Sequence, residues 1–276
     1  MAPTSHATTT VSPLADVGRP DTGQAGDPHD PIALGAVGPD LELWTPRDGI
    51  AEARWQYEEI FEHGVYDGFD LPADALVVDV GANIGLFSIF LSRQVPALRV
   101  VAFEPMPATR AALRRNLHAH LELPARIEPV ALGARDEDAV TFAFYPLVPG
   151  NSTRYPDQKS VQIDALSDVV PADQLAREYA ADEVLVPVRR LADQLEDARI
   201  DLLKIDVEGA ELEVLHGLAD HQWPGVARVV LEVQDLDDRL AAVVALLEQH
   251  GFTVDVAPAP MIPSSVRTSI VRAVRA

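Results

Sequence analysis

The sequence predicts an α/β fold in which a mostly parallel sheet is covered by helices on both faces. First, short apolar segments alternate with helical patterns through most of the chain, which is typical of parallel sheets. Second, LVVDVGANIGLFSIFL at residues 76–91 joins an apolar strand, a glycine-containing turn and a helical pattern. Third, LLKIDVEGAELEVLHG at residues 202–217 has the same order, with acids where the strand ends. Such units bring backbone close to a nucleotide-like ligand.

Length and charge limit the class of protein. The 276 residues suffice for one α/β domain of about 200 residues with a tail. The net charge of −21 argues against partners such as nucleic acid or an anionic membrane surface. The chain has no cysteine, which excludes disulfides and thiolate metal sites. Because no secretory signal pattern and no membrane-spanning apolar stretch is present, we expect a cytoplasmic protein.

The N-terminal part is expected to precede the main domain. Residues 1–38 are rich in Thr, Pro, Gly, Ala and Asp without a sustained period, which predicts a flexible tail. Residues 39–75 form a lead-in segment. Its first part, PDLELWTPRD, predicts a short strand and turn, and the pattern from Ile50 to Tyr66 is helical. Tyr66 could either cover a bound ligand or pack against the domain.

Residues 76–276 carry the alternation that defines the main domain. Short apolar segments in this part are each followed by an amphipathic pattern, as in βα units. Two further apolar segments at the end of the chain are expected to pair as a hairpin. The expected strands are 76–80, 99–103, 126–132, 201–207, 227–234, 252–256 and 268–274, and the expected helices are 85–94, 107–120, 209–218 and 237–250.

The alternation is interrupted at about residues 139–190, which we interpret as a substrate-loop insert. AVTFAFY at 139–145 alternates like an exposed strand, and a long polar stretch follows at 148–182. Residues 184–195 predict another strand and a short helix. A polar stretch of this length within a compact domain is usually functional or disordered.

The turn after the first strand carries the first candidate ligand-binding residues. Gly81 and Gly85 suit positive φ or close approach of a ligand, and Asn83 tolerates left-handed geometry. The helix that follows offers unpaired N–H groups. Glu104 follows Gly85 by 19 residues, a spacing at which an acid binds the ribose of NAD or S-adenosylmethionine (SAM). The turn G-A-N-I-G departs from G-x-G-x-x-G and therefore disfavours NAD.

A second group of candidates follows the strand at 201–207. Asp206 lies at the carboxyl end of this strand, where ligands bind in open parallel sheets, and should face the same crevice as the glycine turn. Glu208 comes two residues later, where an acid could instead cap the helix, as could Glu211. A third strand ends in VVLEVQ, and its acid should be functional or paired. That acid is Glu232, and Lys204 is the structural partner expected for it or for Asp206.

These segments resemble a known family. DVGANIGLFSIFL, FEP and LLKIDVEGAELEVLHGL resemble the motif set of FkbM-family SAM-dependent methyltransferases, and YEEIFEHGVYDGFDL is similar to the lead-in of members from polyketide and related clusters. The resemblance spans about residues 50–256, but residues 148–182 have no general counterpart. It implies a Rossmann-like class I methyltransferase fold, with a seven-stranded, mostly parallel sheet and an antiparallel terminal strand. It also implies SAM as the cofactor.

The resemblance also implies roles for individual residues. The glycine turn would hold the methionine end of SAM, the acid of FEP would bind the ribose hydroxyls, and PVALG would border the adenine. Asp206 and Glu208 would face the methyl group and the acceptor. With Tyr66 as a candidate cover, the cofactor-binding candidates are Tyr66, Asp79, Gly81, Asn83, Gly85, Glu104, Pro105, Val130, Ala131 and Asp206.

The implied reaction is methyl transfer to a hydroxyl oxygen of a small polyketide, peptide or sugar intermediate, free or attached to a carrier protein. The protein would accelerate this in-line displacement mainly by aligning the acceptor oxygen with the methyl group of SAM. An alcohol must also lose its proton during the attack. Asp206 is the first candidate for positioning or deprotonating the acceptor, with Glu208 and Glu232 next. His216 is expected to be structural. The sequence makes no prediction of oligomeric state.

Four alternatives stay open at this point. A divalent cation held by Asp206, Glu208 and Glu232 could lower the pKa of the acceptor hydroxyl, although we expect no metal. The acceptor could be a carboxylic acid, which needs no base. The chain could be a SAM-binding, non-catalytic partner in a biosynthetic assembly line, or an NAD-dependent oxidoreductase.

Overall fold

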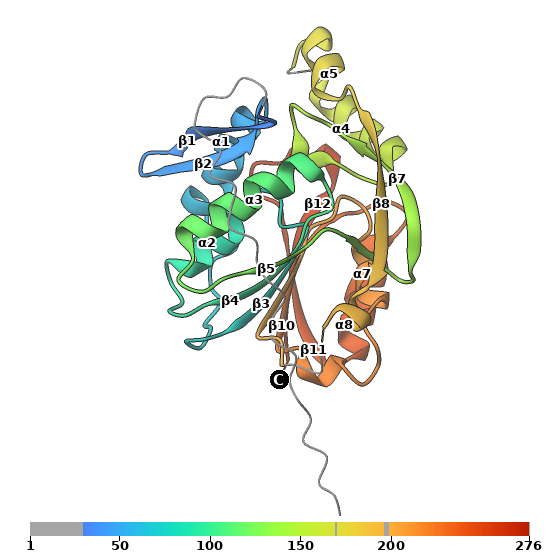
Figure 1. The fold of residues 1–276 in the computed structure, drawn as a ribbon. Coiled ribbons are helices and arrows are strands. Elements are labelled where there is room, and N and C mark those ends of the chain that lie inside the picture. Colours follow the sequence, from blue (N-terminus) through green and yellow to red (C-terminus); the bar gives the residue numbers. More distant parts are fainter. Residues whose placement is uncertain (1–29, 169, 196–198, 276) are drawn as a thin grey trace, which may run out of the picture.

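The computed structural model describes residues 30–168, 170–195 and 199–275. Its main element is a seven-stranded sheet with strand order β11-β12-β10-β9-β3-β4-β5 (Figure 1). All neighbours pair in parallel except β12, which is antiparallel to both β10 and β11, so the predicted fold class is confirmed. The strands are β3 (Leu76–Val80), β4 (Arg99–Phe103), β5 (Arg126–Glu128), β9 (Leu202–Ile205), β10 (Arg228–Gln234), β11 (Phe252–Pro258) and β12 (Thr268–Arg275).

The order of the central strands creates a crevice. All residues of β3 and β9 are buried, as expected for parallel strands covered on both faces. β3 pairs with β4 on one side and with β9 on the other. The connections therefore lead away from β3 in opposite directions, and a crevice opens beyond the carboxyl ends of these strands. β10 lies one strand further along, next to β9.

Helices cover both faces of the sheet (Figure 1). On one face, α2 (Leu86–Ser92) and α3 (Pro107–His120) bury their apolar side chains in a large core cluster. On the other face, α7 (Glu211–His216) and α8 (Arg239–Gln249) belong to a second cluster. These helices agree with the expected ones to within a few residues at each end. Among the described residues no helix is long and apolar enough to cross a membrane.

The N-terminal segment begins with a hairpin of β1 (Ile32–Gly38) and β2 (Leu41–Pro46). The prediction of a flexible tail up to residue 38 is therefore wrong for its last residues, because Ile32 and Val37 are buried in the core. Asn116 of α3 fixes the hairpin through two hydrogen bonds of 2.8 Å with the backbone of residue 44. Residues 1–29 of the predicted tail lie outside the described residues.

A helix then leads from the hairpin to the main sheet. α1 (Ile50–Tyr57) continues as one π-helical turn, η1 (Glu58–Glu62). The helix predicted up to Tyr66 therefore ends four residues earlier, after a widened last turn. Such π-helical turns are rare and are often found at functional sites. Helix α1 lies above the carboxyl ends of β3 and β4 (Figure 1).

The insert forms a second, three-stranded sheet rather than one long loop. Its strands are β6 (Ala131–Gly133), β8 (Asp182–Arg190) and β7 (Glu137–Phe144), in that order. The single strand predicted for 126–132 is wrong, because the chain leaves the main sheet after β5 and enters this second sheet as β6.

The polar stretch 148–182 also contains regular structure. It holds helices α4 (Lys159–Leu166) and α5 (Ala172–Glu178), which lie at the upper end of the molecule in Figure 1. The strand predicted from residue 184 is β8, and the short helix after it is α6 (Leu191–Gln194). The insert thus covers the side of the crevice opposite to α1.

Candidate functional site

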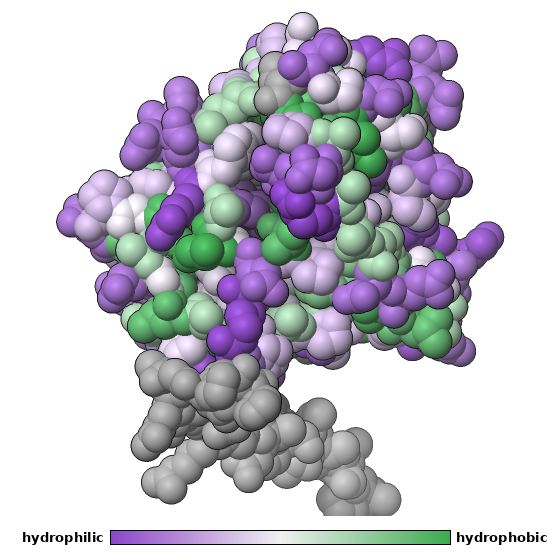
Figure 2. All heavy atoms as spheres, turned by 90° about the horizontal axis from the view of Figure 1, so that it is seen from above, coloured by the Kyte–Doolittle hydropathy of each residue, from purple (hydrophilic) through white to green (hydrophobic). Residues whose placement is uncertain are grey.

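A large cavity of about 530 Å³ lies at the carboxyl ends of the central strands. Its walls come from the glycine turn, helix α1, the insert and the connection between β11 and β12. Seen from this end, apolar surface is exposed in patches among mainly hydrophilic side chains (Figure 2). A volume of this size is typical of a site for a cofactor or small molecule.

The glycine turn after β3 has the geometry that the sequence predicts. Gly81, Asn83 and Gly85 have φ values of 73°, 47° and 94°. A Cβ atom on Gly81 would lie 1.8 Å from the carbonyl oxygen of Asp206, so this position requires glycine. Gly81 and Asn83 line the cavity, whereas Gly85 packs against Leu117 of α3.

Glu104 lies on the cavity floor, at the end of β4. Its Oε2 accepts a hydrogen bond of 3.0 Å from the backbone N–H of Asn83, and its Oε1 accepts one of 2.8 Å from that of Met106. Burial raises the pKa of this carboxyl to about 7, although the two backbone donors and Arg110 oppose the rise. The carboxylate is therefore held rigidly beside the glycine turn.

Asp79 and Lys204 form a buried charged layer beneath the turn. Asp79 is completely buried and accepts a 2.8 Å hydrogen bond from Ser88 Oγ. Lys204 Nζ lies 3.5 Å from Asp79, 3.4 Å from Asp206 and 2.7 Å from the carbonyl oxygen of Gly81. Burial raises the pKa of Asp79. Burial alone would lower the pKa of Lys204, but the two carboxylates raise it overall.

This layer differs from the sequence-based expectation in one respect. Asp79 was predicted to bind the cofactor, yet its side chain lies below the cavity and not on its wall. Lys204 was expected to pair with Glu232 or with Asp206, and it pairs with Asp206 and also with Asp79. The layer fixes the glycine turn because Lys204 binds its first carbonyl.

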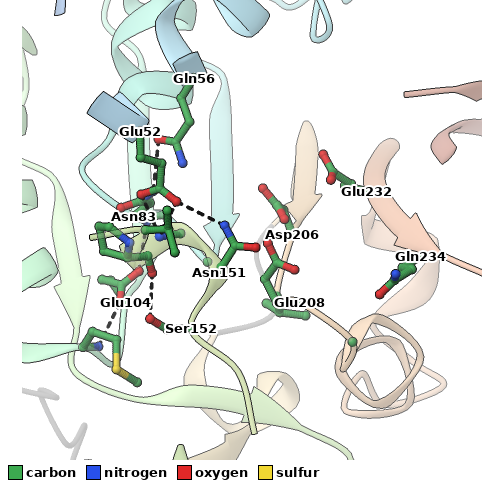
Figure 3. A pocket seen from close by; sticks show the side chains of 18 of the residues that line it. Glu52, Gln56, Asn83, Glu104, Asn151, Ser152, Asp206, Glu208, Glu232 and Gln234 are labelled. Atoms are coloured by element: carbon green, nitrogen blue, oxygen red, sulfur yellow. Dashed lines mark hydrogen bonds between the residues drawn. The ribbon is translucent and has the colours of Figure 1, made fainter. Parts of the chain in front are cut away.

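Asp206 and Glu208 project into the cavity after β9 (Figure 3). Glu208 has a left-handed backbone, with φ of 56°, which is uncommon for a residue other than glycine. Its carboxylate lies 2.5 Å from Lys159 of the insert, and its carbonyl accepts a 2.7 Å hydrogen bond from Thr153. Burial raises the pKa of Glu208, and Lys159 opposes the rise. Glu211, the first residue of α7, does not cap this helix; its Oε1 accepts a hydrogen bond of 2.7 Å from the backbone N–H of Gly209.

The remaining predicted residues lie around the same cavity. Glu232 projects from β10, next to Gln234, and burial raises its pKa well above the ordinary value (Figure 3). Tyr66 both lines the cavity and packs edge-on against Phe87, with ring centroids 4.9 Å apart. His216 is exposed and does not line the cavity. The other predicted residues on the wall are Pro105, Val130 and Ala131.

Sequence reasoning missed the acids and amides that the N-terminal helix contributes. Gln56 Oε1 accepts a 3.0 Å hydrogen bond from Asn83 Nδ2 (Figure 3). Glu52 accepts hydrogen bonds of 2.9 and 3.0 Å from the N–H of Gly150, and one of 3.3 Å from Asn151. Burial raises the pKa of Glu52 to about 8. These bonds join α1, the glycine turn and the insert into a roof over the cavity.

Glu59 was missed as well. It lies in the π-helical turn, is 6% exposed and lines the cavity. Burial raises its pKa to about 8, and the charges of Asp206 and Glu208 add to the rise. No pattern in the sequence marks these residues as functional, because acids on a helical pattern usually face solvent. Within the described part of the chain, no three His, Cys, Asp or Glu side chains are placed to bind one metal ion.

The strand order, the antiparallel β12 and the site at the carboxyl ends of β3, β4 and β9 define a Rossmann-like class I methyltransferase. The profile of the Methyltransferase FkbM domain matches residues 79–254. The chain therefore belongs to the FkbM methyltransferase family and is a SAM-dependent methyltransferase. This confirms the resemblance found in the sequence and the expected cofactor.

Three relatives illustrate the match. The chain is 37% identical to Methyltransferase 1 of Beauveria bassiana over 221 residues, which is 79% of this chain and 88% of that protein. It is 38% identical to the 31-O-demethyl-FK506 methyltransferase FkbM of Streptomyces tacrolimicus, over 74% of this chain and 83% of that protein. It is also 37% identical to the AMB antimetabolite synthetase AmbE of Pseudomonas aeruginosa, where the match covers 75% of this chain but 11% of that protein.

Proposed function

We propose that this protein methylates a hydroxyl oxygen of a small metabolite, such as a polyketide, peptide or sugar intermediate. The observation that carries the proposal is the position of Asp206. This carboxylate lies on the cavity wall next to the glycine turn and is held by Lys204 at 3.4 Å. A fixed carboxylate beside the cofactor site suits an acceptor that must lose a proton.

The cavity has the features that SAM needs. Asn83 Oδ1 is buried without a hydrogen-bond partner among the described residues, and Gly81 keeps side chains out of the turn. We propose that the glycine turn binds the methionine end of SAM and that Glu104 accepts hydrogen bonds from the ribose. Pro105, Val130 and Ala131 would border the adenine, and Tyr66 would close the site. Asp79 and Gly85 would act from behind, by supporting the turn.

In the proposed mechanism the cavity positions the acceptor and removes its proton. SAM, when bound, would supply an electrophilic methyl group on a sulfonium sulfur, and transfer of this group to the acceptor oxygen would leave S-adenosylhomocysteine (SAH). Asp206 accepts the hydroxyl proton, while Lys204 holds its carboxylate in place. Glu208 and Glu232 would orient the acceptor from the adjoining walls.

The domain arrangement that we propose follows from the same site. Residues 76–276 would form the SAM-binding domain, residues 39–75 its lead-in and lid, and the insert at about 139–190 the acceptor-side wall. An acceptor attached to a carrier protein is a second candidate, supported by the match to one part of the much longer AmbE. Carboxyl methylation and a non-catalytic SAM-binding role remain rivals that the experiments below separate.

The first experiment is titration calorimetry with SAM and SAH. We expect micromolar binding to the wild type and a loss of about tenfold or more in Glu104→Gln, because the buried carboxylate would no longer accept the ribose hydrogen bonds. Glu128→Gln removes a charge from the neighbouring strand, outside the cavity, and should bind normally. Failure of the folded wild type to bind either compound would refute the proposal.

The second experiment tests the chemistry. Extracts or panels of hydroxylated metabolites are incubated with the enzyme and SAM labelled in the methyl group. Asp206→Asn should retain SAH binding and lose about 100-fold or more in kcat for an alcohol. Retention of activity in this variant, with an alkali-labile product, would favour a carboxyl acceptor. SAM binding without any product would favour the non-catalytic role.

A further inference from the structure

The half of the cavity beyond the glycine turn holds more acidic groups than basic ones. Glu59, Asp206, Glu208 and Glu232 all line it. Lys204 is shared between Asp206 and the buried Asp79, and Lys159 of the insert pairs with Glu208. Among the described residues, no basic group lies within 4.0 Å of the carboxylates of Glu59 or Glu232. Two acids of the cavity wall are therefore left without a cation.

Glu59 shows most clearly that a partner is missing. It is 6% exposed, and its Oε1 has no hydrogen-bond partner among the residues that the structure describes. A buried carboxylate oxygen without a partner is costly unless a ligand satisfies it. Glu59 belongs to the π-helical turn Glu58–Glu62, and Glu62 of the same turn is exposed.

The cofactor could pair with only some of these acids. At neutral pH, SAM carries one sulfonium, one ammonium and one carboxylate, so it brings one net positive charge. The glycine turn and Glu104 lie on the opposite side of Asp206 from β10, which carries Glu232 (Figure 3). Glu232 is therefore one strand further from the cofactor than Asp206 is. The acceptor would bind on this side of the cavity, near Glu232.

We propose that the acceptor carries a protonated amine and that Glu59 and Glu232 bind it. The inference rests on the proposed function, since the hydroxyl of the same molecule would face Asp206. An ammonium group can donate a hydrogen bond to each carboxyl group at once. Its positive charge also lowers their raised pKa values, so that both bind it as carboxylates. Tyr66, Phe87 and Ile262 supply apolar wall in the same cavity. The class of acceptor is thus an amino alcohol, or an aminated larger metabolite, with apolar surface.

The experiment uses the full chain saturated with SAH and a matched pair of probes. One probe is 2-amino-1-phenylethanol and the other is 1-phenylethane-1,2-diol, which has a similar shape but no charge. Both are titrated by calorimetry or ligand-observed NMR. The wild type should bind the amine about tenfold or more tightly than the diol, because charge-assisted hydrogen bonds are the stronger ones. Glu59→Gln and Glu232→Gln should each remove this preference.

The control is Glu62→Gln, which removes an exposed charge from the same helical turn and should keep the preference. Equal binding of the two probes, binding of neither, or a preference that survives in a folded Glu59→Gln or Glu232→Gln variant would overturn the inference. Loss of SAH binding in these variants would also overturn it, because the acids would then serve the cofactor. If the wild type binds SAH normally but shows no preference for the amine, only the amine inference is refuted and the proposed methylation stands. If the wild type does not bind SAH, both the proposed methylation and the amine inference are refuted.

Discussion

Lys204 is the residue on which the charges of the site depend. Its ammonium lies between Asp79 and Asp206 and also binds the carbonyl of Gly81. Removal of one partner from a buried pair leaves the other charge uncompensated. The same lysine thus stabilises the fold through Asp79 and orients the proposed base, Asp206.

We expect Lys204→Met to lower the free energy of unfolding by about 3 kcal/mol or more, because Asp79 would remain buried without its cation. Urea denaturation measures this as a fall in midpoint at an unchanged slope. The double variant with Asp79→Asn should recover part of the loss, since no buried charge is left behind. A loss below about 1 kcal/mol would show that the pair does not stabilise the fold.

For single residues, the sequence predicts which strand end a residue occupies better than it predicts what the side chain contacts. Glu104 and Asp206 line the cavity as predicted, because the end of a parallel strand is fixed once the sheet is known. Asp79 was placed at the ligand, but its position within β3 turns its side chain into the core. Glu52 and Glu59 could not be predicted, because packing of the lead-in helix over the crevice brings them to the site.

The turn between β3 and α2 has little room for an added side chain at Gly81. Two glycines with positive φ provide a matched comparison. Gly81 has φ of 73° and approaches the carbonyl of Asp206, whereas Gly68 has φ of 91° and open space around its Cβ position. Their alanine variants share the backbone strain and differ in the close approach.

We expect Gly68→Ala to cost about 1 to 2 kcal/mol, the ordinary penalty of left-handed backbone. Gly81→Ala should cost at least about 2 kcal/mol more and lose SAH binding, because a Cβ at 1.8 Å would push β3 and β9 apart. Thermal unfolding and calorimetry measure both effects. Similar stability of the two variants would mean that the strand ends can separate freely.

The insert is the second element whose contacts matter. Lys159 is 3% exposed and donates hydrogen bonds to Asn151 at 2.9 Å and to Glu208 at 2.5 Å. It therefore ties α4 to the cavity wall. The sequence indicated only a long polar stretch here, because α4 and α5 have few buried residues of their own and depend on such tertiary contacts.

We expect Lys159→Met to loosen the insert over the cavity, since Glu208 would lose its cation. Hydrogen exchange at residues 147–166 should become faster, and KM for the acceptor should rise more than the Kd for SAH. Arg177→Met is the control, because Arg177 forms an exposed pair with Asp173 in α5. Unchanged exchange in Lys159→Met would show that the roof is held by other contacts.

For the whole molecule, the sequence predicts the architecture of the main sheet but not how α1 and the insert cover the cavity. The alternation of strands and helices and the terminal hairpin are properties of the apolar pattern, and the structure has them. How α1 and the insert meet above the cavity depends on side-chain contacts between segments about 100 residues apart, such as Glu52 with Gly150. No local pattern encodes such a meeting.

The buried acids also give the whole molecule a pH dependence. Burial raises the pKa values of Glu52 and Glu59 to about 8 and those of Glu104 and Glu211 to about 7, from 4.5. At pH values between the ordinary pKa of 4.5 and the raised pKa, each of these carboxyls keeps a proton in the folded state that it has lost in the unfolded state. The free energy of unfolding therefore decreases as pH rises from about 4.5 to about 8. The net charge of −21 acts in the same direction through self-repulsion.

We expect the melting temperature of the ligand-free protein to fall steadily between about pH 5.5 and about pH 8.5, and salt to reduce the fall by screening self-repulsion. Glu52→Gln and Glu59→Gln should each flatten the profile, because each removes one proton that the folded state retains. Glu62→Gln, whose carboxyl is exposed, should lower only the self-repulsion and leave most of the slope. SAM should stabilise the protein more at high pH than at low pH, since its positive charge compensates the acids once they ionise. A melting temperature that rises over this range would contradict the burial of these carboxyls in a closed site.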